Sequence, residues 1–244
     1  MRGVVLKNHW SETASIAYLV RKHGVQGIEV FGAVSLDTPV GGMNAQAVRY
    51  MVDVTGGWGR IVWLPTHDSE HEVTYNKEER PLVRVARDGA LLPETLEVIA
   101  LVAEHGLTLA TGHVTPEETL MILQEARKRG VTRLIVTHPL LDPQFTFMSM
   151  HQLRAAVDLG AIIEITAGSL WREGPGRERV LEAIRAIGPA SFFVASDSGL
   201  TGTPNHTDSL VLAARVLRQN GVDERALNVM FKENPARLLG LPIQ

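Results

Sequence analysis

Residues 107–113 (LTLATGH) and 133–138 (RLIVTH) decide the expected fold, because each is a short apolar run that ends in a histidine. Between them, residues 116–129 have the spacing of an amphipathic helix, and Gly130 follows where such a helix would end. A strand, a helix and a second strand in this order form a β-α-β unit with parallel strands. We therefore expect both histidines at the same edge of a sheet, where the carboxyl ends of the strands meet.

The same alternation extends along the whole chain. Seven strands are expected, at 3–8, 27–34, 60–66, 107–112, 133–137, 161–165 and 191–196. Seven helices are expected, at 11–23, 44–54, 93–105, 116–129, 149–159, 177–186 and 208–219. Proline and acidic residues begin several of these helices and glycines follow their ends, as capping chemistry requires. The pattern predicts an α/β fold, a TIM-like (β/α) barrel in a single domain over residues 1–244.

One polar segment, at about 67–90, interrupts this rhythm. Its second half alternates between apolar and basic residues and then reaches Asp88-Gly89, which predicts a short hairpin. An insertion at this point would lie over the strand ends and would cover a site there. The alternative, a solvated loop without a role, stays open.

Composition excludes several classes of protein. The formal net charge is −3 with acids and bases mixed along the chain, so no basic stripe suits nucleic acid. The chain has no cysteine, which excludes disulfides and thiol catalysis. No apolar run has the length of a membrane span or the form of a signal peptide. We expect a cytoplasmic protein that binds a small-molecule substrate and neither nucleic acid nor membrane.

Three candidate metal ligands follow predicted strands. His113 and His138 end the two runs quoted above, and Asp197 ends the last run, FFVASD at 192–197. A single histidine at a strand end is usually structural, but three such residues in phase on three strands favour a shared site. Neutral imidazoles and a carboxylate are the ligands that zinc and similar divalent ions take.

Two further candidates follow the first expected strand, in the segment KNH. Strand alternation would place Lys7 and His9 on the same side. His9 is a candidate fourth metal ligand, with a proton carrier or a helix cap as alternatives. Lys7 is a candidate catalytic residue, since an ammonium group could hold a substrate anion or a developing oxyanion.

A cluster of polar residues follows the third expected strand. His67, Asp68 and His71 are candidate substrate-binding residues, and a solvated turn is the alternative. Trp171 also follows a strand end, where it would line a pocket or pack in the core.

Strands that end in His, His and Asp, followed by ENPARLLGL at 233–241, resemble the amidohydrolase superfamily of metal-dependent hydrolases. The KNH segment and the cluster at 66–71 are similar to an uncharacterised branch of it. The resemblance implies a divalent metal, zinc first with manganese or iron as alternatives. It also implies hydrolysis of an amide, lactone, cyclic imide or ester by a metal-activated water, with Asp197 as the base.

One departure from that superfamily concerns its opening strand, which normally carries a His-x-His pair. This chain has no such pair, so we expect seven strands without the usual first strand; either that strand precedes the sequence given, or this is a reduced barrel that closes differently. Exposed strand edges would then favour a homo-oligomer. Two other functions stay open: a metal-dependent decarboxylase of the same superfamily, and a catalytically inactive barrel that acts as a binding or assembly protein.

Overall fold

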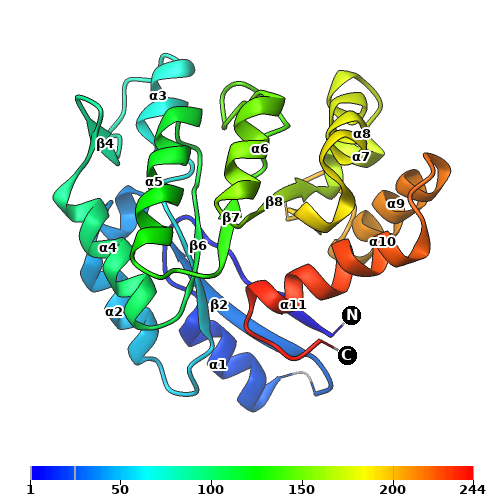
Figure 1. The fold of residues 1–244 in the computed structure, drawn as a ribbon. Coiled ribbons are helices and arrows are strands. Elements are labelled where there is room, and N and C mark those ends of the chain that lie inside the picture. The colour runs from blue at the N-terminus through cyan, green and yellow to red at the C-terminus, as the bar shows by residue number, and fades with distance from the viewer. Residues whose placement is uncertain (1, 25, 200, 244) are drawn as a thin grey trace. The chain divides into compact units, whose positions relative to one another are not determined.

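Seven strands of one sheet carry the fold of the computed structural model, which describes all residues except 1, 25, 200 and 244 (Figure 1). In sheet order they are β1 (Gly3–Val5), β2 (Glu29–Ser35), β3 (Gly59–Trp63), β6 (Thr108–Ala110), β7 (Leu134–Val136), β8 (Ala161–Thr166) and β9 (Phe192–Ala195). Sheet order is therefore chain order, as β-α-β units joined side by side require. The expected α/β fold with seven parallel strands is confirmed.

All seven expected helices are present. They are α1 (Ala14–His23), α2 (Ala45–Asp53), α4 (Pro93–Glu104), α5 (Pro116–Lys128), α6 (Met150–Asp158), α8 (Pro175–Ile187) and α9 (His206–Gln219). Side-chain caps fix where two of them begin. The hydroxyls of Thr115 and Ser149 each accept a hydrogen bond from the backbone N–H three residues later. The side chains of Glu118 and Gln152 accept one from the backbone N–H of Thr115 and Ser149, so α5 and α6 both start in capping boxes.

Further short elements were not expected from the sequence. They are α3 (Glu70–Tyr75), α7 (Ala167–Trp171), α10 (Glu224–Asn228), a π-helical segment (Val229–Glu233) and α11 (Asn234–Leu238). Each has only five or six residues, too few for a clear apolar period.

The contacts within the chain divide it into two compact units, residues 1–134 and 135–244, which are described separately below. The expectation of a single domain stays a prediction.

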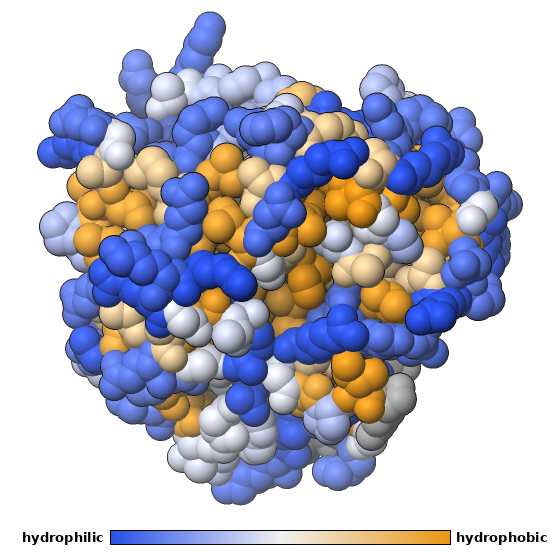
Figure 2. Space-filling model, viewed as in Figure 1, coloured by the Kyte–Doolittle hydropathy of each residue, from blue (hydrophilic) through white to orange (hydrophobic). Residues whose placement is uncertain are grey.

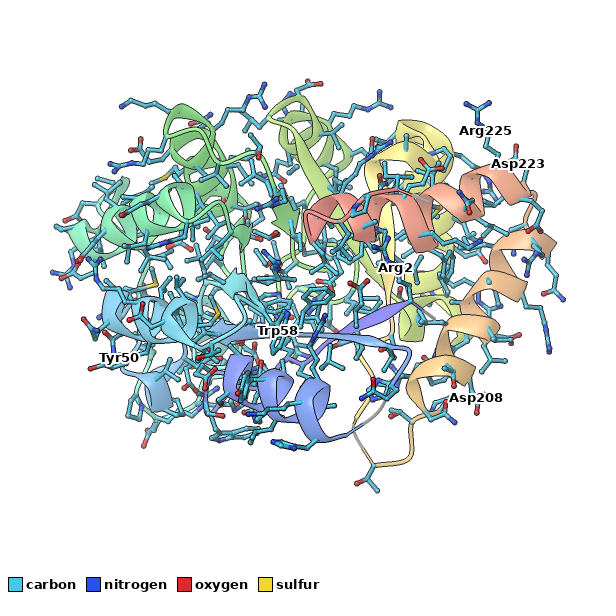
Figure 3. The ribbon with its side chains drawn as sticks, turned by 90° about the horizontal axis from the view of Figure 1, so that it is seen from below. Arg2, Tyr50, Trp58, Asp208, Asp223 and Arg225 are labelled. Carbon is cyan, nitrogen blue, oxygen red and sulfur yellow. The ribbon has the colours of Figure 1, made fainter. Side chains whose placement is uncertain are left out.

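In the first unit, helices cover a parallel four-stranded sheet. The pairs β1-β2, β2-β3 and β3-β6 are all parallel. Helix α4 packs against both α2 and α5, and Figure 1 shows these helices side by side. Their apolar faces are buried, including Met51, Ile99 and Ile122. Tyr50, by contrast, points away from α2 and is 63% exposed (Figure 3).

The polar segment at 67–90 does contain the expected hairpin. Strands β4 (Ala86–Arg87) and β5 (Ala90–Leu91) pair antiparallel across Asp88 and Gly89, whose φ angles are 51° and 76°. Two positive φ angles in a two-residue loop are typical of a type I′ turn. Val83 N–H donates to the Asp68 carbonyl, so the segment returns to the point where it left the sheet.

In the second unit, β8 and β9 pair in parallel and α7 packs against both α8 and α9. The tail that begins at Asn234 is tied to this sheet by one buried side chain. The Asn234 amide donates to the carbonyls of Ala190 and Phe192, at 2.9 and 2.7 Å. The asparagine of the ENPARLLGL tail therefore fixes α11 beside β9.

The exposed surface is mixed. On the face that Figure 2 shows, hydrophobic residues are interrupted by hydrophilic ones. Over the described residues, the model contains no helix with the length and apolar character needed to span a membrane.

Candidate functional site

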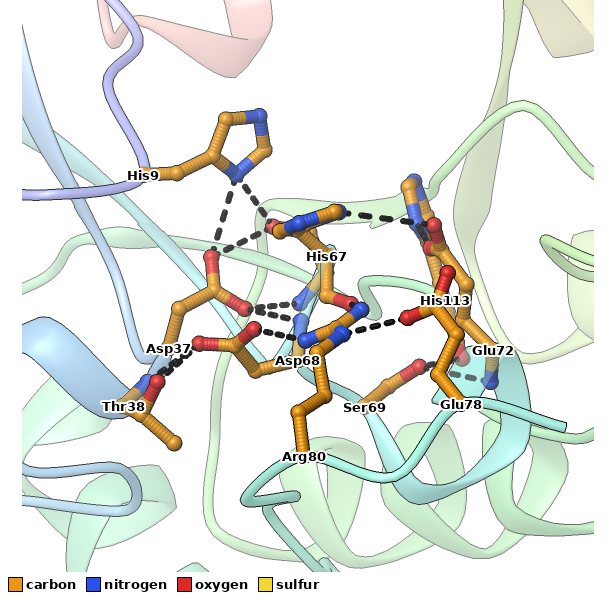
Figure 4. A network of polar contacts seen from close by, with 11 residues as sticks. His9, Asp37, Thr38, His67, Asp68, Ser69, Glu72, Glu78, Arg80 and His113 are labelled. Atoms are coloured by element: carbon orange, nitrogen blue, oxygen red, sulfur yellow. Dashed lines mark hydrogen bonds and ion pairs between the residues drawn. The ribbon is translucent and has the colours of Figure 1, made fainter. Parts of the chain in front are cut away.

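Polar side chains from four strand ends gather in the first unit (Figure 4). His9 follows β1, Asp37 follows β2, Thr66 and Asp68 follow β3, and His113 follows β6. Because these strands are parallel, their carboxyl ends lie along one edge of the sheet, where active sites of α/β folds are built. Long-range hydrogen bonds join most of these residues.

Asp37 is the most buried carboxylate of this cluster. It is fully buried, and its oxygens accept hydrogen bonds from the Thr66 hydroxyl at 2.7 Å and from the Thr66 and Asp68 amides at 2.8 and 3.0 Å. Burial alone would raise its pKa, but the hydrogen bonds from His9, Thr66 and the backbone hold the pKa of Asp37 below its ordinary value. Asp37 is therefore ionised at neutral pH.

His9 is oriented by this carboxylate. Its Nδ1 lies 3.1 Å from Asp37 Oδ2 and 2.8 Å from the Thr66 hydroxyl oxygen. An ionised carboxylate only accepts, so His9 Nδ1 carries the proton of this contact. The other ring nitrogen, Nε2, points away from the network (Figure 4), and about a third of the side chain is exposed. His9 Nε2 thus faces away from the carboxylate that orients the ring.

His113 is held in a similar way by a second carboxylate. Its Nδ1 lies 2.5 Å from Glu72 Oε2, and both side chains are buried. Burial first, and then the positive charge of Lys7, lower the pKa of His113 well below its ordinary value. The imidazole is therefore neutral near pH 7, the form in which histidine binds metals.

Glu72 is itself perturbed by burial. Burial raises the pKa of Glu72 to about 7, although the charges of His67 and Arg80 act to lower it. When Glu72 is ionised, His113 Nδ1 donates to it and Nε2 keeps a lone pair. A carboxylate behind the imidazole is the usual partner of a metal-binding histidine.

Gly112 shapes the backbone that carries His113. Its φ is 71°, and a Cβ at this position would lie 2.2 Å from the Pro65 carbonyl oxygen. His113 N–H donates to the same carbonyl at 2.9 Å. The close approach of the β3 and β6 ends therefore requires glycine before the histidine.

Arg80 fixes the polar segment to the strand ends. Its guanidinium bonds Asp68 and Glu78 and donates to the His67 carbonyl at 2.6 Å. Asp68 also accepts from the Thr38 amide at 2.9 Å. Arg80 is thus bonded to the start of its own segment, where Asp68 belongs to the cluster.

The remaining candidates of the first unit lie around the cluster. Lys7 Nζ lies 5.3 Å from the centre of the Trp63 ring. His67 is half exposed, with Nδ1 3.6 Å from Glu72 Oε1. His71 lies on α3, its ring centre 6.3 Å from that of Tyr75. The structure brings His67 to the cluster and places His71 on the neighbouring helix; the substrate-binding role of both stays a prediction.

Two other candidates lie in the second unit, each two residues after the end of a strand. His138 and Asp197 have φ angles of 23° and 46°, in the left-handed region that residues other than glycine seldom adopt. Such strain is concentrated at functional sites, where surrounding structure stabilises it. His138 is buried with its ring edge-on to Phe145, at 5.4 Å between centres. Asp197 is exposed to a cavity of about 320 Å³, which Trp171 also lines.

A metal requires several donors at one point. Among the residues that the structure describes, no group of three or more His, Cys, Asp or Glu side chains is arranged to hold a metal ion. The shared site of His113, His138, Asp197 and His9 therefore stays a prediction. The donor chemistry of the first unit does fit a metal, because it includes two imidazoles, His9 and His113, whose Nδ1 atoms each face a carboxylate.

Sequence reasoning missed Asp37 and Glu72, the carboxylates that orient the two histidines. Asp37 does carry a signal, since it follows a predicted strand by three residues. Glu72 lies in the segment that was read as a polar excursion, and nothing in its spacing indicates His113 as its partner.

A family model, described as a family of unknown function (DUF6282), matches residues 1–164. The chain belongs to the DUF6282 family. No curated protein matches the chain at a significant level.

Solved structures resemble this DUF6282 chain in fold. An amidohydrolase from Burkholderia multivorans has a TM-score of 0.60 at 13% identity, over 98% of this chain and 83% of its own. A lactonase mutant from Deinococcus radiodurans, described as PTE-like, has a TM-score of 0.58 at 14% identity, over 88% of this chain and 74% of its own. N-acetyl-D-glucosamine-6-phosphate deacetylase from Mycobacterium smegmatis has a TM-score of 0.58 at 21% identity, over 95% of this chain and 61% of its own. The resemblance to amidohydrolases, and with it the TIM-like fold, is confirmed at the level of the fold.

Proposed function

We propose that this DUF6282 chain is a metal-dependent hydrolase that cleaves an amide, lactone, cyclic imide or ester of a small molecule. The observation that carries the proposal is the pairing of buried, neutral His113 with the Glu72 carboxylate at the carboxyl ends of the strands. A buried imidazole that is fixed at Nδ1 and neutral at physiological pH is suited to bind a metal through Nε2. The likeness to amidohydrolase and lactonase folds supports the same reading.

His113, His138 and Asp197 would hold the metal, with His9 Nε2 as a fourth donor. Zinc is favoured by two imidazoles and a carboxylate, and manganese or iron would also suit them. A bound divalent ion would supply a polarised carbonyl and an activated water.

The chain's own groups would move the proton and hold the substrate. Asp197 would accept the proton of the attacking water at its carboxylate and pass it to the leaving group. Lys7 would stabilise the developing oxyanion, since its charge already acts on His113. Asp37 would keep the Nδ1 proton of His9 in place, so that Nε2 would point to the metal. His67, Asp68 and His71 would contact the substrate.

The proposal is tested by hydrolysis assays on a panel of 4-nitrophenyl esters, lactones and amides. Protein is assayed as purified, after treatment with a chelator, and after zinc or manganese is restored. We expect activity that the chelator abolishes and the metal restores, and that Asp197→Asn lowers at least about 100-fold. Asp158→Asn, an exposed aspartate on α6, is the matched control.

Two outcomes would replace the proposal. Release of carbon dioxide from a carboxylic acid added to the panel, without hydrolysis of the other substrates, would indicate the decarboxylase. Protein that binds no metal and has no activity on any substrate of the panel would favour the binding or assembly barrel.

A further inference from the structure

The cavity at Asp197 is lined in part by Trp171 and Arg172, which have no role in the proposed hydrolysis. It is formed in the second unit by the segments that follow β7, β8 and β9, so it opens at the carboxyl ends of these strands. Its volume, about 320 Å³, is at the lower end of the range for small-molecule sites. Trp171 and Arg172, at the end of α7, form the wall of interest.

Arg172 brings the one cation among the described residues that line this cavity. Its guanidinium lies over the Trp171 ring, 4.5 Å from the ring centre. Over the part of the chain that the structure describes, this guanidinium makes no ion pair and donates no hydrogen bond, whereas its neighbour Glu173 pairs with Arg177. A stacked guanidinium keeps the N–H groups on its edge available to an anion.

The backbone around Arg172 is held in place from two sides. Arg177 donates to the carbonyls of Leu170 and Trp171, at 2.7 and 3.0 Å, and to that of Arg172 at 3.2 Å. On the other side, Trp171 Nε1 donates to the buried Ser209 hydroxyl on α9 at 3.1 Å. The Trp171 ring, over which the Arg172 guanidinium lies, is therefore held in place before any ligand binds.

We propose that this cavity binds a substrate with one carboxylate, which Arg172 recognises while the reacting carbonyl lies at Asp197. The inference rests on the proposed function for the role of Asp197. A planar guanidinium matches a carboxylate with two parallel hydrogen bonds. Ser196 and Ser198 also line the cavity; the Ser198 hydroxyl donates to the Ser196 carbonyl at 3.4 Å, and the Ser196 hydroxyl lies 3.2 Å from His206 Nδ1.

The charges of the cavity disfavour a second negative charge on the substrate. Asp142 and Asp197 line the cavity together with Arg172. A phosphate dianion would be repelled by both carboxylates, and Arg172 could offset only part of that repulsion. A monocarboxylate is therefore favoured over a phosphate monoester.

The test is a binding measurement that needs no catalysis. Levulinate carries one carboxylate and a ketone but no bond that a hydrolase cleaves, and 2-pentanone is its neutral counterpart. The chain has four tryptophans, so the Trp171 indole N–H can be assigned by Trp171→Phe and followed by ¹⁵N NMR. Each ligand is titrated into protein with and without chelator, and inorganic phosphate is titrated as the dianion.

We expect levulinate to shift the Trp171 signal with saturation, and to bind at least about tenfold more tightly than 2-pentanone or phosphate. Arg172→Ala is expected to remove this preference. Arg225→Ala is the control, because Arg225 is exposed on α10 and points away from the protein in Figure 3. Equal binding of levulinate and 2-pentanone, or unchanged levulinate binding by Arg172→Ala, would overturn the inference.

The chelator separates this inference from the proposed function. Levulinate binding that persists without metal and depends on Arg172 would support the subsite even if no hydrolysis is found. Hydrolysis without any carboxylate preference would support the proposed function and refute the subsite.

Discussion

Gly112→Ala tests how tightly the strand ends are built around His113. Gly112 has a φ of 71°, and an added Cβ would lie 2.2 Å from the Pro65 carbonyl oxygen and 2.5 Å from that of Leu64. The left-handed conformation costs a non-glycine residue about 1–2 kcal/mol. Overlap with rigid backbone adds roughly 1–3 kcal/mol. We therefore expect the free energy of unfolding to fall by about 2–5 kcal/mol.

Gly130→Ala is the matched control, because it shares the positive φ without the overlap. Gly130 has a φ of 86°, and a Cβ there would meet no atom within 4 Å, so only the conformational cost of about 1–2 kcal/mol applies. Urea unfolding followed by circular dichroism measures both variants under the same conditions. If Gly112→Ala loses no more stability than Gly130→Ala, the close approach of the strand ends is not as described.

Three further predictions concern buried polar groups. Burial raises the pKa of Glu72 to about 7. The contribution of Glu72 to the free energy of unfolding is therefore complete below the ordinary pKa of a glutamate and is lost as the pH rises through about 7. The glutamine of Glu72→Gln does not titrate. In the presence of chelator, the variant should therefore gain stability relative to wild type between about pH 5 and pH 8, and a difference independent of pH would contradict this. Asp37 has a lowered pKa, so its contribution is present above the ordinary value and is lost in acid. Asp37→Asn should lose roughly 2–4 kcal/mol in urea unfolding at neutral pH, and less as the pH approaches 3; a loss under about 0.5 kcal/mol would count against the network. Asn234→Ala should lower the free energy of unfolding, measured by thermal unfolding, by about 1–3 kcal/mol, because two carbonyls lose their donor. Asn220→Ala, at an exposed asparagine, should lower it by less than about 1 kcal/mol.

The strands and long helices were predictable from the sequence because their signals are local. The runs 107–113 and 133–138 are short, apolar and bounded by glycine or threonine, and the helix between them begins in a capping box. Strand lengths were less predictable. The first strand was expected to reach residue 8 but ends at Val5, because the last ladder bond runs from Leu6 N–H to the Phe31 carbonyl and the chain then leaves the sheet.

The candidate site was predictable only in part, because its partners depend on loops. His9, His67, Asp68 and His113 were identified from their places after strands, and they do lie in one region of the first unit. Asp37 could not be ranked above other loop acids, since the amides and hydroxyl that it binds belong to residues about thirty positions later. Hydrogen bonds over such separations depend on tertiary structure and have no sequence period.

The Glu72–His113 pair shows the same limit more sharply. Glu72 lies in a six-residue helix within the polar segment, too short to be predicted, and its partner is forty-one positions away. The strain at His138 and Asp197 is likewise a property of the folded backbone, although their positions after strands were read correctly.

Metal content is the most direct test of the central claim that His113, oriented by Glu72, is a metal ligand. Inductively coupled plasma mass spectrometry would be applied to untagged wild type, His113→Ala, Glu72→Gln and the control His105→Ala, an exposed histidine. We expect near-stoichiometric metal in wild type and control, none in His113→Ala, and an affinity lowered by about 10–100-fold in Glu72→Gln. A wild type that stays free of metal after incubation with zinc or manganese, or a His113→Ala variant that keeps its metal, would contradict the account.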